Sequence, residues 1–411
     1  MEEATGPLSL LALTDDPARQ LACARRYERE KIKPPTRILT NRENYGHSRL
    51  RVGYLSSDYC MHPVSMLTVE LFEQHNRERV EVYGFCWSRD DGSPLRKRVV
   101  ESFDHFFQIG GMSDEEAATL IRSHEIDVLV DLHGLTLGSR PGILGYRSAP
   151  VQVSYLGFPG TSGIPGVDYI LADRYIIPPE EVRHYSEKPL YLPRCFQVSD
   201  RKRVSSPKPT RAACGLPDEG FVFCSFNNNY KFTPEMFGVW GRILKRVPGS
   251  VLWLLADNRW AEENLRNAAE AEGVSRDRVI FGGRVAPNDY LARYLVADLF
   301  LDNQPFGAGT TANDALWQGL PLLTCPGRAF ASRMGGSLLQ TLGVTELIAD
   351  SLQDYEEKAV ALGNDPERAK LLREYLQSRV RNSPLFDIPA RTREIEDLYF
   401  EALAEVTGQV V

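Results

Sequence analysis

Residues 221–255 read FVFCSFNNNYKFTPEMFGVWGRILKRVPGSVLWLL, and the fold class follows from this stretch. An apolar run at 221–226 is followed by a polar loop, by a segment of helical periodicity at 234–246, and by a second apolar run at 251–255. Short, nearly continuous apolar runs around a helix are typical of parallel strands buried on both faces. The stretch therefore predicts one strand–helix–strand unit of a doubly wound α/β sheet.

The same alternation extends in both directions. Downstream apolar runs lie at 278–281, 298–301 and 321–324, with helical stretches at 260–272, 288–297 and 311–319 between them. Upstream runs lie at 51–55, 80–87, 127–132, 151–156 and 167–172, with a helical stretch at 113–124. The basic, proline-containing segment SDRKRVSSPKPTR at 199–211 has no apolar period and is predicted to be a linker. Two Rossmann-like domains facing a shared cleft are expected.

The predicted domains are an N-terminal helical segment at 1–44, a first α/β domain at 45–203 and a second at 204–411 with a closing helix at 388–403. Within the first segment, Asp16 before Pro17 predicts a capped helix start, and Lys33-Pro34-Pro35 predicts its end. No 34-residue repeat is visible in the sequence.

The amino-acid composition of the chain excludes several classes of protein function. The chain has 411 residues and a net charge of −7, which argues against a nucleic-acid-binding protein. The acidic start lacks the basic region of a secretion signal, and the apolar stretch at 8–13 is too short to span a bilayer, so no membrane partner is expected. Seven scattered cysteines without a CxxC pair predict reduced thiols and a cytoplasmic location.

Candidate site residues follow the predicted strands of the second domain. Lys231 comes after the run at 221–226, where a cation suits the phosphate of a leaving group. The segment FGAGTTAND at 306–314 opens a helix with Thr310 and Thr311, and a helix N-terminus attracts phosphate. Asp314, one turn later, is positioned to accept hydrogen bonds from ribose. An ordinary polar turn and an ordinary capped helix remain alternatives for the two motifs, and a surface loop remains one for Ala286 and Arg293.

Two histidines follow strands of the first domain. His62 follows the run at 51–55 and His133 follows the run at 127–132, so both are expected at one edge of a sheet. Each suits a general base or a hydrogen-bond partner of sugar or phosphate, and a structural role is the alternative. The glycine-rich loop at 156–163 can close on a sugar or form a plain turn. The sequence contains no Asp-x-Asp, HExxH or paired His/Cys motif, so no metal cofactor is expected.

Together these motifs resemble glycosyltransferase family 41, the family of protein O-GlcNAc transferases. The resemblance runs from about residue 51 to 398 and rests on motifs in the family's order: RVGYLSSDYCMHP (51–63), DLHGLT (131–136), YLGFPGTSG (155–163), FNNNYK (226–231), PGSVLWLLAD (248–257), GGRVAP (282–287), FGAGTTANDALWQGLPLLT (306–324) and ASRMGGSLL (331–339). It implies a GT-B fold and metal-independent, inverting transfer of a sugar, GlcNAc first among those expected, from a UDP-sugar to serine or threonine of a protein.

The positions of residues within these motifs imply their roles in the site. The resemblance implies that Lys231 stabilises the leaving diphosphate and that His62 lies near the reacting centre. The implied donor-binding residues are Asn228, Tyr230, Ala286, Arg293, Phe306, Gly309, Thr310, Thr311 and Asp314. The implied sugar and acceptor residues are His133, Thr136, Leu156 and Gly157.

Three positions depart from the animal members of the family. Gly309 stands in place of a histidine, Phe306 in place of a smaller cysteine near the N-acetyl group, and His133 in place of an asparagine. Transfer of glucose to asparagine, transfer of fucose from a GDP-sugar, and a nucleotide-binding pseudoenzyme or adaptor therefore stay open. The short spacing between the domains resembles that of bacterial members, and the tetratricopeptide repeats with which members hold protein substrates are absent from this sequence.

Overall fold

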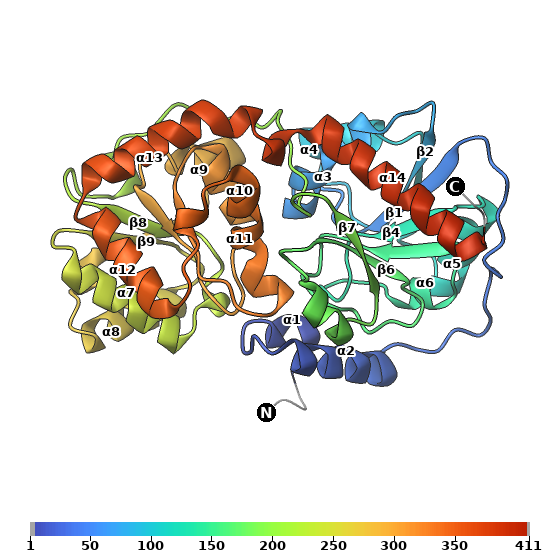
Figure 1. Cartoon of the computed structure of the whole chain (residues 1–411), viewed down its shortest axis with the longest axis horizontal. Helices are drawn as coiled ribbons and strands as arrows, with labels where there is room; N and C mark the ends of the chain where they lie inside the picture. Colours follow the sequence, from blue (N-terminus) through green and yellow to red (C-terminus); the bar gives the residue numbers. More distant parts are fainter. Residues whose placement is uncertain (1–4, 409–411) are drawn as a thin grey trace. The chain divides into compact units, whose positions relative to one another are not determined.

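The computed structural model describes residues 5–408, which form two compact units with one parallel sheet each (Figure 1). Unit 1 holds the described residues of Met1–Leu10, Asp16–Arg201 and Asp387–Val411, and unit 2 holds Leu11–Asp15 and Lys202–Phe386. The predicted α/β class with two doubly wound domains is confirmed.

The sheet of unit 1 has the strand order β3-β2-β1-β4-β5-β6-β7, with every neighbouring pair parallel. The order reverses between β1 and β4, where Val52 pairs with Val128. Such a reversal is the position at which ligands bind doubly wound sheets. The strands are β1 (Leu50–Ser56), β2 (Val80–Cys86), β3 (His105–Gln108), β4 (Val128–Asp131), β5 (Val151–Ser154), β6 (Tyr169–Asp173) and β7 (Lys188–Leu192).

Five of these strands correspond to the predicted apolar runs, and the two edge strands do not. The first and last residues of β3 are polar and exposed, and β7 begins with an exposed lysine followed by proline, so neither resembles the longer apolar runs of the other strands. The helices of unit 1 are α1 (Pro7–Leu10), α2 (Pro17–Lys31), α3 (Pro63–Gln74), α4 (Pro94–Glu101), α5 (Asp114–Ser123), α6 (Gly142–Gly145) and α14 (Ile388–Thr407), with a 3-10 turn at Pro179–His184.

The helix of the N-terminal segment begins and ends where the sequence predicts. The Asp16 side chain accepts a hydrogen bond from the Ala18 amide at 2.9 Å and caps α2, as expected, and α2 ends at Lys31. Residues 32–44 form no helix, so the helix covers only part of the predicted segment 1–44 and ends next to Lys33-Pro34-Pro35, where its end was predicted. The physical reason is Pro34-Pro35, because proline disfavours the helical conformation of the residue before it and removes an amide donor. Residues 1–4 lie outside the described part.

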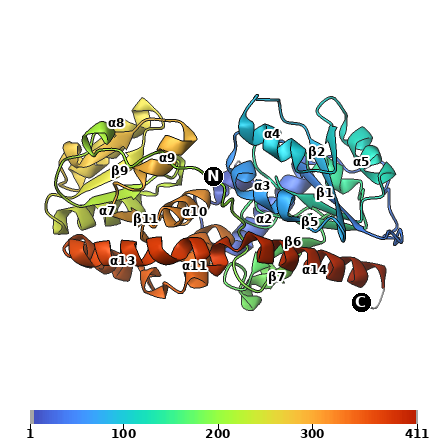
Figure 2. The same cartoon turned by 90° about the horizontal axis from the view of Figure 1, so that it is seen from above.

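The sheet of unit 2 has the order β10-β9-β8-β11-β12, again with all pairs parallel and a reversal between β8 and β11. Helices α8 and α13 lie on opposite sides of this sheet in both views (Figures 1 and 2). The strands are β8 (Val222–Ser225), β9 (Val251–Leu255), β10 (Val279–Gly282), β11 (Leu299–Leu301) and β12 (Leu322–Leu323). The helices are α7 (Pro234–Arg246), α8 (Arg259–Ala271), α9 (Pro287–Arg293), α10 (Thr310–Trp317), α11 (Phe330–Leu342), α12 (Leu352–Gly363) and α13 (Pro366–Arg379).

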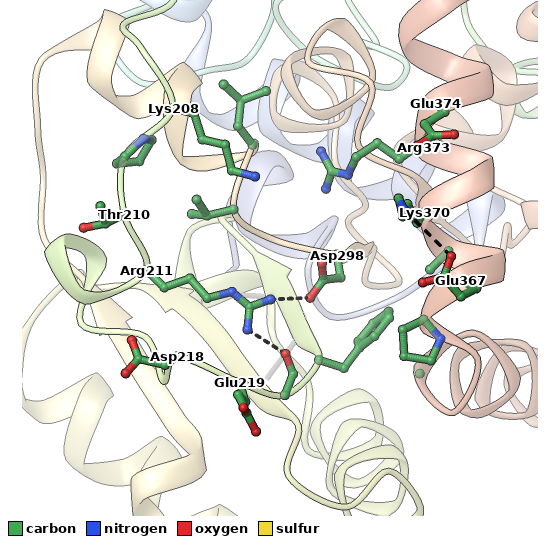
Figure 3. Close-up of a pocket in the computed structure, with 18 of the residues that line it drawn as sticks. Lys208, Thr210, Arg211, Asp218, Glu219, Asp298, Glu367, Lys370, Arg373 and Glu374 are labelled. Atoms are coloured by element: carbon green, nitrogen blue, oxygen red, sulfur yellow. Dashed lines mark hydrogen bonds and ion pairs between the residues drawn. The ribbon is translucent and has the colours of Figure 1, made fainter.

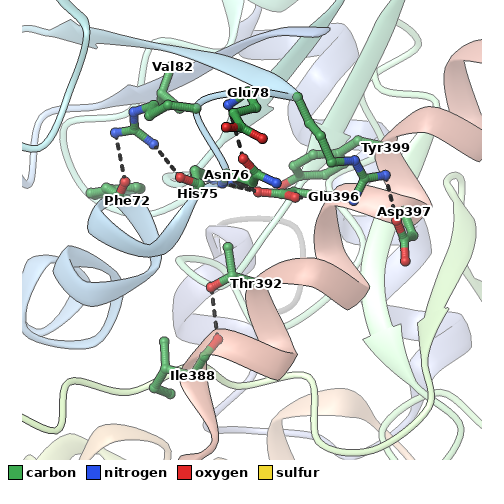
Figure 4. A network of polar contacts seen from close by, with 12 residues as sticks. Phe72, His75, Asn76, Glu78, Val82, Ile388, Thr392, Glu396, Asp397 and Tyr399 are labelled. Atoms are coloured by element: carbon green, nitrogen blue, oxygen red, sulfur yellow. Dashed lines mark hydrogen bonds and ion pairs between the residues drawn. The ribbon is translucent and has the colours of Figure 1, made fainter. Parts of the chain in front are cut away.

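The final helix belongs to unit 1, which differs from the predicted extent of the second domain, 204–411. Ile395, Tyr399 and Ala402 of α14 are buried in the core formed by the strands of unit 1. His75 joins this helix to the end of α3, because its Nδ1 lies 2.9 Å from Glu396 Oε1 (Figure 4). Its Nε2 lies 2.8 Å from the Tyr54 hydroxyl. The amphipathic pattern of α14 predicts a helix, but it does not show which sheet the helix covers.

The buried His75 predicts a pH dependence of the stability of unit 1. Burial lowers its pKa from the ordinary 6.5, so the folded state holds the ring neutral while the unfolded chain takes up a proton. The free energy of unfolding should therefore fall as pH drops through 6.5, by at most about 1.4 kcal/mol per pH unit. His75→Gln keeps a donor and an acceptor and should flatten this slope between pH 7.5 and 5.5 in urea unfolding. Equal slopes in the two proteins would contradict the assignment.

Two further predictions concern the whole chain. All seven cysteines are free thiols, five of them buried, in agreement with the expected absence of a disulfide framework. Within residues 5–408, no helix combines the length and the apolar character that a bilayer crossing requires.

Candidate functional site

The site candidates of unit 2 gather where the strand order reverses. Asn227 follows β8 and is buried, and its Oδ1 accepts a hydrogen bond from the Thr311 hydroxyl at 2.5 Å. Its amide nitrogen donates to Oδ1 of Asn303, which follows β11. The loop after β8 and the start of α10 are therefore in direct contact. The two motifs singled out in the sequence form one surface at the carboxyl ends of β8 and β11.

Lys231 lies in this surface, in the 3-10 turn Asn229–Lys231. Its ammonium donates to the Gly307 carbonyl at 3.4 Å and lies 3.7 Å from the centroid of the Phe306 ring. The exposed Tyr230 meets the same ring edge-on at 6.2 Å. Burial lowers the pKa of Lys231 to about 8, and the charge of Asp302 opposes that effect. The turn presents a cation that no carboxylate contacts at ion-pair distance within the described residues.

Asp302 supports this loop and was missed by the sequence reasoning. Its Oδ1 accepts from the amides of Asn303 at 2.8 Å and Ala308 at 2.7 Å, and its Oδ2 accepts from the Thr324 hydroxyl at 2.7 Å. Burial raises its pKa to about 6. A signal was present, because Asp302-Asn303 directly follows the apolar run of β11.

Helix α10 begins without a side-chain cap. Gly309 is its N-cap residue, so the first amides of the helix have no partner on that residue. Such amides and the positive end of a helix favour an anion. Asp314, one turn into α10, is buried, and Arg203 Nη1 donates to its Oδ1 at 2.6 Å. Burial raises the pKa of Asp314 to about 6, while Arg203 acts to lower it.

The remaining donor candidates lie around the neighbouring strands. Ala286 is the N-cap residue of α9, and Arg293 at the end of that helix donates to the Gly283 carbonyl at 2.6 Å. Asn228 is exposed, and its carbonyl accepts from the Lys231 amide at 3.1 Å. Among the described residues, no hydrogen bond or ion pair joins Ala286 or Arg293 to Lys231. The structure thus brings Lys231, Phe306, Thr311 and Asp314 into one connected surface, and leaves the predicted base-binding residues at its side.

The candidates of unit 1 also lie at a strand-order reversal, after β1 and β4. His133 is almost fully buried: its Nε2 lies 2.5 Å from the Ser57 hydroxyl and its Nδ1 lies 2.5 Å from the Thr136 hydroxyl. The indole of Trp87 stacks on its ring at 5.3 Å. Both ring nitrogens have partners within unit 1, so His133 orients the hydroxyls of Ser57 and Thr136.

Ser57, His133 and Asp58 do not form a hydrolytic triad. Such a triad needs the serine and the carboxylate on opposite nitrogens of the imidazole. Here Asp58 Oδ2 lies 3.5 Å from His133 Nε2, the nitrogen that Ser57 also approaches. The cluster is therefore arranged for hydrogen bonding and does not activate Ser57 as a nucleophile.

His62 lies next to this cluster and caps α3. Its Nδ1 accepts from the Val64 amide at 3.3 Å and lies 3.5 Å from Asp58 Oδ2. Burial lowers the pKa of His62, with Asp58 opposing the effect. An Nδ1 that accepts a hydrogen bond leaves the proton of the neutral ring on Nε2. In this state His62 presents a donor, whereas a general base must present a lone pair.

The loop after β5 is pressed against the loop after β4. Leu156 adopts a left-handed backbone with φ of 68°, which a non-glycine residue holds only when its surroundings enforce it. A side chain at Gly157 would place its Cβ 2.8 Å from the Leu132 carbonyl carbon and 3.1 Å from His133 Cα. The backbone of one loop thus fixes that of the other, and both loops carry predicted sugar-site residues.

A pocket of about 970 Å³ lies at the other end of the unit 2 strands (Figure 3). Phe221 and Asp298, which precede β8 and β11, line it, and Arg211 donates to Asp298 at 3.1 Å. Its other charged residues are of both signs: Lys208, Lys370, Arg373, Asp218, Glu219, Glu367 and Glu374. None of the predicted site residues lines this pocket, and it opens at the amino ends of the strands.

Comparison with known proteins identifies the family of this chain. The sequence model described as Glycosyl transferase family 41 matches residues 30–208 and 203–395. The chain is similar to the probable UDP-N-acetylglucosamine–peptide N-acetylglucosaminyltransferase SEC of Arabidopsis thaliana, with 37% identity over 96% of this chain and 42% of that protein. It is also similar to the UDP-N-acetylglucosamine–peptide N-acetylglucosaminyltransferase of Caenorhabditis elegans, with 29% identity over 85% of this chain and 40% of that protein.

Among solved structures, the chain is similar to an O-GlcNAc transferase of Thermobaculum terrenum. The TM-score is 0.86 at 29% identity, over 96% of this chain and 75% of that chain. A sucrose-phosphate synthase of Thermosynechococcus elongatus shares the fold alone, with a TM-score of 0.58 at 14% identity over 87% of this chain and 100% of that chain. The chain spans about two fifths of the length of the two curated relatives above.

Proposed function

The chain belongs to glycosyltransferase family 41, and from this premise we propose that it transfers a sugar from a UDP-sugar to serine or threonine hydroxyls of protein acceptors. GlcNAc is the sugar we propose. Support comes from the names of the relatives, which are UDP-N-acetylglucosamine–peptide transferases. The acceptor proteins, a cytoplasmic location and a bacterial origin are part of the same proposal.

One observation supports this function most directly. At the strand-order reversal of unit 2, hydrogen bonds join Lys231 to the loop before α10 and Thr311 to the loop after β8, and Asp314 lies one turn further along α10. A cation and a helix N-terminus suit a diphosphate, and a carboxylate one helical turn later suits a ribose. We assign the diphosphate to Lys231, Thr310 and Thr311, the ribose to Asp314, and the base to Ala286, Arg293 and Asn228. Tyr230, Phe306 and Gly309 complete the proposed donor site.

The proposed reaction is a single displacement. The acceptor oxygen forms a bond to the anomeric carbon while the bond from that carbon to the diphosphate oxygen breaks, with inversion. UDP leaves with the electron pair, and its growing negative charge is met by Lys231 and the start of α10. These groups supply the positive charge that the step needs, so the proposal involves no metal. The acceptor hydroxyl gives up its proton to a general base as the new bond forms.

In unit 1 we propose a sugar and acceptor role for the loops after β1, β4 and β5. The Nε2 proton of His62 can donate to a sugar or phosphate oxygen, which agrees with its capping geometry better than the role of general base does. His133 would act by orienting Thr136. The loop at Leu156 and Gly157 would contact the sugar.

The test is release of UDP or GDP by the purified chain with UDP-GlcNAc, UDP-glucose, UDP-galactose and GDP-fucose, with and without a bacterial lysate as acceptor source. We expect lysate-stimulated release of UDP from UDP-GlcNAc. Stimulated release from another donor would replace the proposed sugar, and Phe306 is the residue to examine in that case. Binding of UDP without release from any donor would overturn the catalytic proposal in favour of a nucleotide-binding adaptor.

A further inference from the structure

Arg203 lies in the basic segment predicted to be a linker. It comes two residues after Arg201, where the segment 16–201 of unit 1 ends. Its side chain is nearly buried and turns back onto α10. Nη1 donates to Asp314 Oδ1 at 2.6 Å, and Nη2 donates to Asn313 Oδ1 at 2.9 Å. One guanidinium thus holds two consecutive side chains of the helix that begins the proposed phosphate site.

Aromatic rings fix the plane of this guanidinium. Its central carbon lies 4.9 Å from the centroid of the Trp317 ring and 6.0 Å from that of Phe386, and these two rings lie 4.9 Å apart. A planar, delocalised cation stacks on rings and donates in two directions at once, which an ammonium cannot do. Phe386 is the last residue of unit 2 before α14. The segment 202–386 of unit 2 therefore contacts α10 at both of its ends, through Arg203 near its start and through Phe386 at its last residue.

The ion pair with Arg203 uses only one of the two carboxylate oxygens of Asp314. Oδ1 is occupied by Arg203, whereas Oδ2 has no hydrogen-bond partner among the described residues. A buried carboxylate is stable in its ionised form only when it is paired. Arg203 provides that pairing from the side and fixes the direction in which Oδ2 points.

We propose that Arg203 is a positioning residue for the donor: it acts through Asp314, whose Oδ2 it holds ready to accept hydrogen bonds from the ribose hydroxyls of a nucleoside diphosphate. The inference rests on the proposed function, because it takes the ribose contact of Asp314 from there. It adds a residue outside the sequence motifs quoted for the family resemblance, and it explains why this residue is an arginine.

The charge environment gives this role a distinctive pH dependence. Burial raises the pKa of Asp314 to about 6, and the charge of Arg203 lowers it. Tyr290 of α9 and Tyr294, which follows that helix, are the other titratable groups near Asp314. Loss of Arg203 removes the charge that lowers this pKa, so the pKa of Asp314 rises further and its ionised fraction falls more at pH 6.5 than at pH 8.5. A loss caused only by poorer packing of the helix would not depend on pH in this way.

The experiment measures the binding of UDP and of 2′,3′-dideoxy-UDP by calorimetry at pH 6.5 and 8.5. Relative to the wild-type chain at the same pH, we expect Arg203→Met to weaken UDP binding about tenfold or more at pH 6.5 and by a smaller factor at pH 8.5. It should discriminate little between the two nucleotides at pH 6.5, whereas the wild-type chain prefers UDP. Arg381→Met is the matched control, because Arg381 also lies over the Trp317 ring, at 4.3 Å, without contacting Asp314.

Two further variants keep the inference testable if Arg203→Met folds poorly. Arg203→Lys keeps the charge without the two simultaneous hydrogen bonds and should show an intermediate loss. Asp314→Asn should bind UDP weakly, by a factor relative to the wild-type chain that does not change between pH 6.5 and 8.5. An equal loss at both pH values, or for both nucleotides, would overturn the positioning role while leaving the proposed function intact. A wild-type chain that does not bind UDP would overturn both.

Discussion

Lys231→Met is expected to reduce kcat by about a hundredfold to a thousandfold while UDP remains bound. The substitution keeps the unbranched stem of the side chain over the Phe306 ring and removes only the charge. Because the leaving diphosphate gains charge as its bond to the sugar breaks, a cation at this position contributes more to the transition state than to the bound donor. The measurement is single-turnover transfer together with the Kd of UDP.

The same residue predicts the alkaline limb of the pH–rate profile. The active form is the ammonium, and its pKa is lowered to about 8 by burial. The kcat/KM should therefore decline as pH rises through 8, since the protonated fraction of Lys231 in the free chain falls from about 90% at pH 7 to about 10% at pH 9. An exposed lysine ordinarily titrates near 10.5 and would leave the rate flat over this range.

Lys245→Met in α7 is the matched control, because Lys245 is a surface lysine that lies 4.0 Å from Glu272. It should leave both kcat and the pH profile unchanged. A Lys231→Met chain that keeps more than about a tenth of wild-type kcat would contradict the assigned role. A profile that stays flat up to pH 9 would show that the ammonium at this position does not limit the reaction.

Burial of the central strands explains why much of the fold was predictable from the sequence. The runs at 222–225 and 251–255 are buried on both faces, so they are apolar throughout, and α7 matches its predicted bounds. Edge strand β3 has no such constraint and escaped notice. Helix α14 was predicted as a helix, but its contact with unit 1 depends on pairs such as His75 and Glu396, which are 321 residues apart. No local pattern encodes a pairing over that distance.

In the candidate site, too, local sequence patterns predicted some residues, while residues that act through distant partners were missed. Lys231, Thr311 and Asp314 were found because they follow strands, where function is expected in doubly wound sheets. Asp302 and Arg203 were missed because their role lies in the partners they hold. In the sequence, Arg203 is one of several basic residues between 201 and 211, and charge runs of this kind usually face solvent. Only the structure shows that it is buried against Asp314.

Gly157→Ala should destabilise unit 1 by about 3 kcal/mol or more, which corresponds to a decrease in Tm of about 6–12 °C for a domain of this size. The added methyl group would lie 2.8 Å from the Leu132 carbonyl carbon and 3.1 Å from His133 Cα. Both are backbone atoms at the end of a buried strand, so no side chain can rotate away to make room. One of the two loops must move, and Leu156 already occupies a left-handed conformation.

Gly111→Ala is the matched control in the same unit, because a Cβ there meets no atom within 4 Å. The two variants make the same chemical change and differ only in the space available, so thermal unfolding isolates the contact between the loops. Since the proposed donor residues all lie in unit 2, Gly157→Ala should still bind UDP below its Tm but should lose sugar transfer. If the two variants unfold within about 0.5 kcal/mol of each other, the loops after β4 and β5 do not constrain one another, and the sugar-site role of Gly157 loses its structural basis.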